Sequence, residues 1–64
     1  MKTIKNSNGR TYNVLGEIGL YMLLQCHQNK EYIIAYNFKG GSWDSGVYTF
    51  DKDYAYKYFK DMLK

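Results

Sequence analysis

The residues best suited to binding chemistry lie in one stretch around two adjacent glycines. Gly40 and Gly41 have no side chains, so their backbone N–H groups can approach an anion closely. Lys39 and Ser42 flank the pair and add a positive charge and a hydroxyl group. Asp44 follows, and its carboxylate can accept hydrogen bonds from a sugar hydroxyl or a base. The stretch therefore predicts a site for an anionic, nucleotide-like ligand.

Aromatic residues surround this stretch. Trp43, Tyr36 and Tyr48 offer flat rings on which a base can stack, an interaction worth about 1–3 kcal/mol per base. A structural alternative remains open, in which the stretch is only a tight hairpin and Trp43 closes the end of the core. Asp44 would then accept hydrogen bonds from nearby backbone N–H groups. The Gly-Gly-Ser sequence also lacks the helix context and the Lys-Ser/Thr ending of a P-loop.

Catalytic and metal-binding residues are sparse. His27 is the single histidine and it adjoins the single cysteine, Cys26. Neighbouring residues on a strand point to opposite faces, so the two make a poor nucleophile–base pair. One His and one Cys also do not supply the three or four ligands of a zinc site. We therefore expect a non-enzymatic protein with no catalytic residues, no metal and no cofactor.

A second candidate surface lies near the C-terminus. Tyr54 and Tyr56 do not fit the apolar stripe of the helix expected there, and Lys57 and Lys60 lie close to them in the sequence. These four residues predict an exposed surface that is both aromatic and basic. The alternative is an ordinary solvated helix face.

Turn signals divide the chain into short strands. Asn8-Gly9 is typical of a two-residue hairpin turn, here between residues 3–5 and 10–15. A break or bulge is expected at 16–19, turns at 28–30 and 39–42, and strands over 20–26, 31–38 and 43–50. In the strand over 31–38, alternation places one set of residues on one face and a second set on the other. The first set is Tyr32, Ile34, Tyr36 and Phe38, and the second is Ile33, Ala35 and Asn37.

The last segment has helical rather than strand periodicity. Apolar residues recur there at three- and four-residue spacing, namely Ala55, Tyr58, Phe59, Met62 and Leu63. Asp51 precedes them as a suitable N-cap. The expected fold is α+β, a small antiparallel β-meander of about four to five strands covered by one C-terminal α-helix. It forms a single domain over residues 1–64. Because one helix covers one face of the sheet, we expect a second protomer to cover the other.

Composition sets limits on function. The chain has 64 residues, of which 45% are hydrophobic and 23% charged, the balance of one small folded domain. A domain of this size is too small for a deep cleft, so a ligand pocket is expected between protomers. The net charge of +3 mildly favours anionic partners but is too dispersed for a nucleic-acid-binding stripe. With one cysteine, no signal core and no membrane-spanning run, a cytoplasmic protein is expected.

The C-terminal half resembles a group of small proteins of unknown function from bacterial phages and mobile elements. The resemblance rests on the strand residues 32–38, the Gly41-Ser42-Trp43 sequence, the Gly46-Val47-Tyr48 sequence, and a closing helix with Tyr58-Phe59. It covers roughly half of the chain and carries over no active-site residue.

The resemblance implies a setting in the cytoplasm of an infected bacterial cell, where small phage proteins blunt host defence. Some sequester nucleotide signals as oligomeric sponges, and others bind a defence enzyme, as anti-CRISPR proteins do. The residues around the glycines favour the first, a homo-oligomer that sequesters a nucleotide-like anion. The alternative is a protein that binds and inhibits a host defence enzyme such as a CRISPR nuclease. Nucleic-acid binding fits less well, and no membrane partner is expected.

Overall fold

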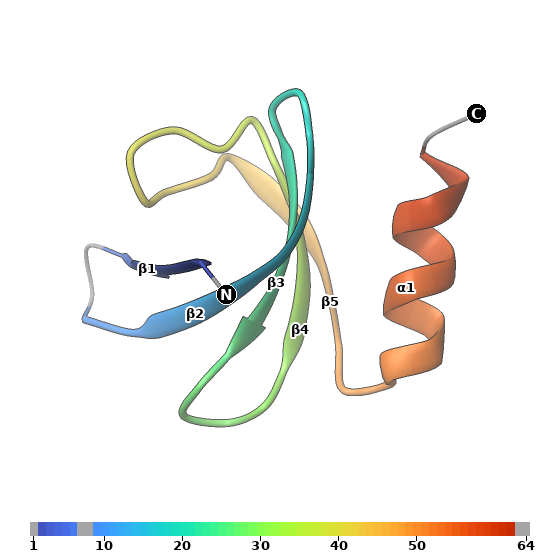
Figure 1. Ribbon diagram of the computed structural model, residues 1–64, viewed down its shortest axis with the longest axis horizontal. Helices are drawn as coiled ribbons and strands as arrows, with labels where there is room; N and C mark the ends of the chain where they lie inside the picture. The colour runs from blue at the N-terminus through green and yellow to red at the C-terminus, as the bar shows by residue number, and fades with distance from the viewer. Residues whose placement is uncertain (1, 7–8, 63–64) are drawn as a thin grey trace.

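Five strands and one helix make up the protein. The computed structural model describes residues 2–6 and 9–62, and its strands form one antiparallel sheet in chain order (Figure 1). The elements are β1 (Lys2–Lys5), β2 (Thr11–Ile18), β3 (Tyr21–Cys26), β4 (Tyr32–Tyr36), β5 (Ser45–Thr49) and α1 (Lys52–Asp61). The predicted α+β fold, a meander followed by a C-terminal helix, is confirmed.

The strand boundaries follow from local backbone conformation. The turn between β3 and β4 is closed by a hydrogen bond from Lys30 N–H to the Cys26 carbonyl, 3.0 Å. Strand β2 runs on to Ile18, with a bulge between Val14 and Gly16, so the predicted irregularity is a bulge followed by a turn at residues 19–20. Gly9 has a φ of +88°, as the predicted first turn requires, while Asn8 lies outside the described residues.

Strand β4 ends earlier than expected because Asn37 adopts a left-handed conformation with φ 55°. This conformation interrupts the alternation of side chains along the strand. Phe38 therefore packs with the cluster that contains Ile33, on the face opposite Tyr36. The prediction that Phe38 shares a face with Tyr36 is wrong for this reason.

Helix α1 is fixed at its start by the predicted cap. The side chain of Asp51 accepts a hydrogen bond from Tyr54 N–H, 3.0 Å, which pairs one of the backbone donors left free at a helix N-terminus. Ala55 and Phe59 are buried against the sheet, as the apolar stripe predicts, while Tyr58 and Met62 are half-buried. Leu63, the last residue of that stripe, lies outside the described residues.

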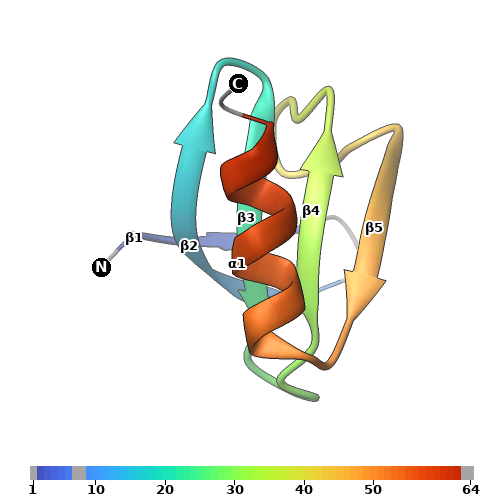
Figure 2. The same ribbon diagram turned by 90° about the vertical axis from the view of Figure 1, so that its right-hand side faces the viewer.

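Helix α1 lies across one face of the sheet (Figure 2). The side chains between the helix and this face form one hydrophobic cluster. Leu23 from β3 and Ile34 from β4 are almost fully buried there beneath Ala55 and Phe59. Gly16 in β2 provides the space for the Phe59 ring, because a Cβ at this position would lie 2.7 Å from the ring.

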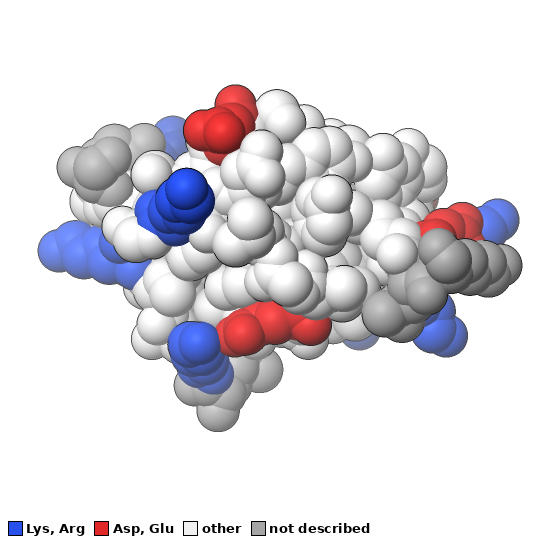
Figure 3. Space-filling model, turned by 90° about the horizontal axis from the view of Figure 1, so that it is seen from above, with Lys and Arg blue, Asp and Glu red and all other residues white. Residues whose placement is uncertain are grey.

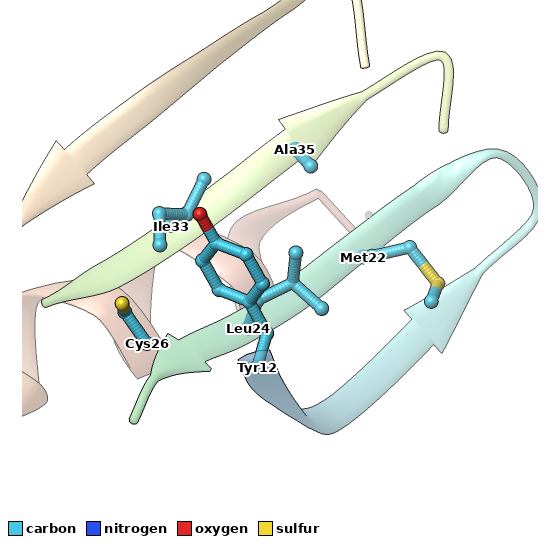
Figure 4. Packing of buried hydrophobic residues seen from close by; sticks show 6 residues of the cluster. All are labelled: Tyr12, Met22, Leu24, Cys26, Ile33 and Ala35. Carbon is cyan, nitrogen blue, oxygen red and sulfur yellow. The ribbon is translucent and has the colours of Figure 1, made fainter. Parts of the chain in front are cut away.

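The other face of the sheet is also covered within the chain. Its buried cluster is Tyr12, Met22, Leu24, Cys26, Ile33 and Ala35 (Figure 4). The sheet curls so that β1 and the loop after β4 lie on the side opposite α1 (Figure 1). Ile4, Phe38 and Trp43 from these segments pack on the cluster. A second protomer is therefore not needed to cover either face of the sheet.

Candidate functional site

The two glycines of the predicted site form a tight turn. Gly40 and Gly41 both have positive φ, 54° and 91°, a conformation that glycine adopts without strain. Lys39 N–H donates to the Ser42 carbonyl, 2.8 Å, and Ser42 N–H donates to the Lys39 carbonyl, 3.0 Å. These two backbone donors are therefore used by the turn itself. We call residues 37–44 the glycine loop.

The glycine loop rests on the end of β1. A Cβ at Gly41 would lie 3.0 Å from the carbonyl oxygen of Lys5, so the two backbones are in close contact. Asn6, Gly41, Ser42 and Trp43 line a small hollow of about 140 Å³. Pockets for small-molecule ligands commonly enclose about 300–1,000 Å³. The hollow can admit a phosphate-sized group, but a whole nucleotide does not fit in it.

Trp43 belongs to the core and borders the hollow as well. Its ring stacks on Phe38, with centroids 6.0 Å apart, and meets Tyr12 edge-on at 5.4 Å. Its indole N–H donates to the Tyr48 hydroxyl, 2.8 Å. The structural alternative, in which Trp43 closes the end of the core, is thus present in the fold. The same ring is one wall of the hollow.

Three side chains of the glycine loop remain available to a ligand. Lys39 is exposed, and it makes no ion pair within the described part of the chain. Ser42 is exposed and its hydroxyl donates to the Lys39 carbonyl, 3.2 Å, so its oxygen can still accept. Asp44 is also exposed, with a carboxylate oxygen 3.4 Å from the side-chain nitrogen of Asn37.

Tyr36 does not join these residues. It lies on the helix side of the sheet, where its hydroxyl is 2.8 Å from the hydroxyl of Tyr58. The hydrogen bond with Tyr58, followed by burial, raises the pKa of Tyr36 to about 12. The predicted site is therefore divided between the two faces of the sheet, with Tyr36 on one and Trp43 on the other.

A row of tyrosines lies on the helix side and was not predicted as a group. The rings of Tyr21 and Tyr36 meet edge-on with their centroids 5.5 Å apart, and the ring centroids of Tyr54 and Tyr58 are 6.0 Å apart. Together with the bond between Tyr36 and Tyr58, these contacts link β3, β4 and α1. The alternation of side chains along β4 predicts which face of the sheet Tyr36 lies on. The position of Tyr58 beside Tyr36 depends on how the helix crosses the sheet, which the sequence pattern does not give.

The surface of α1 carries the second predicted group of residues. Lys52, Asp53, Tyr56, Lys57 and Lys60 border an open groove of about 520 Å³ along the outer side of the helix. All five come from one helix, so flexible side chains alone form the walls. Tyr54 is not among them and contacts Tyr58 instead. Tyr54 is 49% exposed and borders a smaller hollow together with Lys57, so all four predicted residues lie on the exposed surface of the helix.

Cys26 ends β3 and His27 begins the turn that follows, so the two are not neighbours on a strand. Cys26 is 1% exposed, and its thiol donates to the side-chain oxygen of Gln28, 3.3 Å. His27 is exposed, and its ring contacts the side-chain oxygen of Asn13. Across residues 2–6 and 9–62, no group of three or more His, Cys, Asp or Glu side chains could hold a metal ion.

Charged groups and uncharged surface are distributed unevenly. Seen from above, Lys, Arg, Asp and Glu side chains lie mainly toward the two ends and along the margins, with an uncharged surface between them (Figure 3). The described part of the chain has no helix long and apolar enough to cross a membrane.

Comparisons with known proteins give no match. No protein-family model, no curated protein and no solved structure matches this chain.

Proposed function

We propose that the protein is a non-enzymatic binding protein that sequesters a nucleotide-like anion at the glycine loop. The observation that carries this proposal is the exposed Lys39, which has no ion pair among residues 2–6 and 9–62, beside a hollow bordered by Ser42 and Trp43. A phosphate group of the ligand enters the hollow, where the ammonium group of Lys39 balances its charge. The setting, interference with a bacterial defence system during phage infection, follows from the sequence resemblance alone.

The remainder of the ligand needs a second wall. Because the hollow of about 140 Å³ admits only a phosphate-sized group, a sugar and base must extend out of it. Asp44 and the exposed ring of Tyr48 lie on the adjoining surface and offer a carboxylate and an aromatic face. A second copy of the chain completes the pocket, which gives a homo-oligomer a functional role.

Isothermal titration calorimetry tests the proposal with three probes: inorganic phosphate, AMP and a cyclic dinucleotide. The variant Lys39→Ala removes the charge at the glycine loop, and Lys57→Ala removes a charge of the same kind on α1. Both lysines are exposed, so each substitution should change the free energy of unfolding by under about 0.5 kcal/mol. Lys39→Ala should weaken binding of the cyclic dinucleotide severalfold, and Lys57→Ala should leave it unchanged.

The outcome also depends on salt. Screening weakens a charge interaction at high ionic strength, so the difference between wild type and Lys39→Ala should shrink as salt is raised. Weaker binding by Lys57→Ala, with full binding by Lys39→Ala, would place the site on α1. No binding of any probe by the wild type would contradict the proposal.

A second candidate function is inhibition of a host defence enzyme by direct protein binding. Tyr48, Phe50 and Tyr54 favour it, since they are large apolar residues that are 53%, 67% and 49% exposed. Exposed aromatic residues are enriched in protein interfaces. In a cleavage assay with a purified CRISPR nuclease, inhibition by the wild type that Phe50→Ser abolishes and Lys39→Ala retains would support this function.

A further inference from the structure

Strand β5 is an open edge of the sheet. The sheet order places β5 beside β4 on one side, and no other described strand pairs with its second side (Figure 2). An edge strand presents a row of backbone N–H and C=O groups that can pair with another strand. The helix contacts β5 from the face of the sheet and does not replace a neighbouring strand.

The two edges of the sheet differ in how they are protected. Strand β1, at the other edge, is four residues long and carries Lys2 and Lys5. Lysines on an edge discourage pairing, because a second strand would have to desolvate or approach their charges. Strand β5 has the sequence SGVYT, with no charged residue and no proline. Of the two edges in the described part of the chain, β5 is therefore the one less protected against pairing.

We propose that β5 pairs antiparallel with β5 of a second copy, which joins the two sheets into one. The register that centres on Val47 pairs all five residues of each β5, and opposite residues then share a face with both helices on one side of the joined sheet. In this register Ser45 lies opposite Thr49, a pair of hydroxyl residues. Tyr48 lies opposite Gly46, and the glycine brings no side chain that would compete with the exposed tyrosine ring.

The inference deepens the proposed function and rests on it only for the expectation of a homo-oligomer. It uses no ligand, so the dimer and the ligand site can be tested apart. The paired region is only five residues long in each copy. An interface of this size belongs to the weak, transient class, and we expect a dissociation constant on the order of 10–100 µM.

Analytical ultracentrifugation without ligand measures the dimer directly. The wild-type mass should rise from 7.6 kDa toward twice that value as the protein concentration increases from about 10 µM to 1 mM. Ser45→Lys places a charge on the proposed interface and should weaken the dimer at least tenfold. Thr3→Lys makes the same kind of change on the β1 edge and should leave the dimer intact. Circular dichroism melts confirm that both variants fold.

Cysteine cross-linking tests the register. Val47→Cys places two cysteines opposite each other across the dimer axis, and mild oxidation should link them. Ser45→Cys is the control, because its two copies would be about 14 Å apart in this register, beyond the reach of a disulfide. The native Cys26 is buried and remains in both variants.

Three results would overturn the proposal. The first is a wild-type mass that stays at 7.6 kDa over the whole concentration range, which would leave β5 free or paired with a foreign strand. The second is a dimer that Ser45→Lys does not weaken, or that Thr3→Lys weakens equally. The third is cross-linking of Ser45→Cys without cross-linking of Val47→Cys, which would exclude the register.

Discussion

The paired hydroxyls of Tyr36 and Tyr58 make stability sensitive to alkaline pH. The pKa of Tyr36 is raised from 10.0 to about 12 in the folded protein, with the hydrogen bond between the Tyr36 and Tyr58 hydroxyls as the largest cause. Between these values the unfolded chain loses the Tyr36 proton while the folded protein keeps it, so deprotonation favours unfolding. The stabilisation is complete below pH 10 and is lost as the pH rises through about 12.

The prediction is a decrease in the free energy of unfolding above pH 10 that is smaller in Tyr36→Phe than in the wild type. Tyr58→Phe should also show a smaller decrease, because it removes the main cause of the raised pKa. Urea denaturation over this pH range gives the free energies. Equal decreases in the wild type and both variants would show that the two hydroxyls do not interact in solution.

The conformation of single residues decides which parts of the candidate site could be predicted from the sequence. Lys39, Ser42 and Trp43 are close in sequence and fall together in space, because a two-residue glycine turn keeps its neighbours side by side. Tyr36 precedes Asn37, whose left-handed conformation turns the chain to the other face of the sheet. The alternation of side chains predicts a continuous strand through Asn37. Asparagine adopts both the extended and the left-handed conformation, so the sequence does not reveal which one the loop requires.

Among the elements, the contact between α1 and β2 depends on one glycine. Gly16 faces the Phe59 ring, and a Cβ there would lie 2.7 Å from a ring carbon. Gly16→Ala should therefore lower the free energy of unfolding by about 1–3 kcal/mol, as overpacking does. Phe59→Ala removes the large core side chain and should cost about 3–5 kcal/mol.

The two substitutions should not be additive, because Phe59→Ala removes the atoms that the new methyl group meets. In the Phe59→Ala background, Gly16→Ala should cost far less than it does in the wild type. Thermal or urea unfolding of the four proteins gives the coupling energy. Additive effects would mean that Gly16 is needed for the β-bulge alone and that α1 packs elsewhere.

The elements themselves were largely predictable. The period of apolar residues separates strands from helix, and Asp51 marks the helix start as expected. Strand ends were less predictable, as shown by β4 and β5, which are shorter than the pattern indicates. Strand β4 ends and strand β5 begins at the glycine loop, which folds back on the core through a contact between Trp43 and Tyr12 that no local pattern encodes.

At the scale of the whole molecule, the curl of the sheet changes where partners can bind. A flat meander with one helix would leave a broad apolar face for a second protomer. Instead, β1 and the glycine loop cover that face, and Leu24 and Ile33 are 0% and 1% exposed within one chain. The sequence does not show this, because strand twist and long-range closure depend on contacts between residues far apart along the chain. The proposed dimer therefore uses the open edge at β5 instead of a face of the sheet.

Edge pairing and ligand binding are coupled if the ligand lies between protomers. In the proposed register, residues 44 and 50 lie opposite each other, so Phe50 of the second copy approaches Asp44 beside the glycine loop. Phe50 is 67% exposed in the single chain and would supply the second wall that the hollow lacks. By thermodynamic reciprocity, a ligand that binds the dimer more tightly must also strengthen the dimer, by the same factor.

The resulting prediction is that the cyclic dinucleotide raises the dimer fraction seen by ultracentrifugation, while inorganic phosphate, which fills only the hollow, does not. Ser45→Lys should weaken dinucleotide binding severalfold through loss of the dimer, although Ser45 itself does not border the hollow. Lys39→Ala should weaken dinucleotide binding without changing the ligand-free dimer, because Lys39 lies outside β5. If Ser45→Lys abolishes the dimer and the dinucleotide still binds with full affinity, the site is complete within one chain and Phe50 plays no part in it.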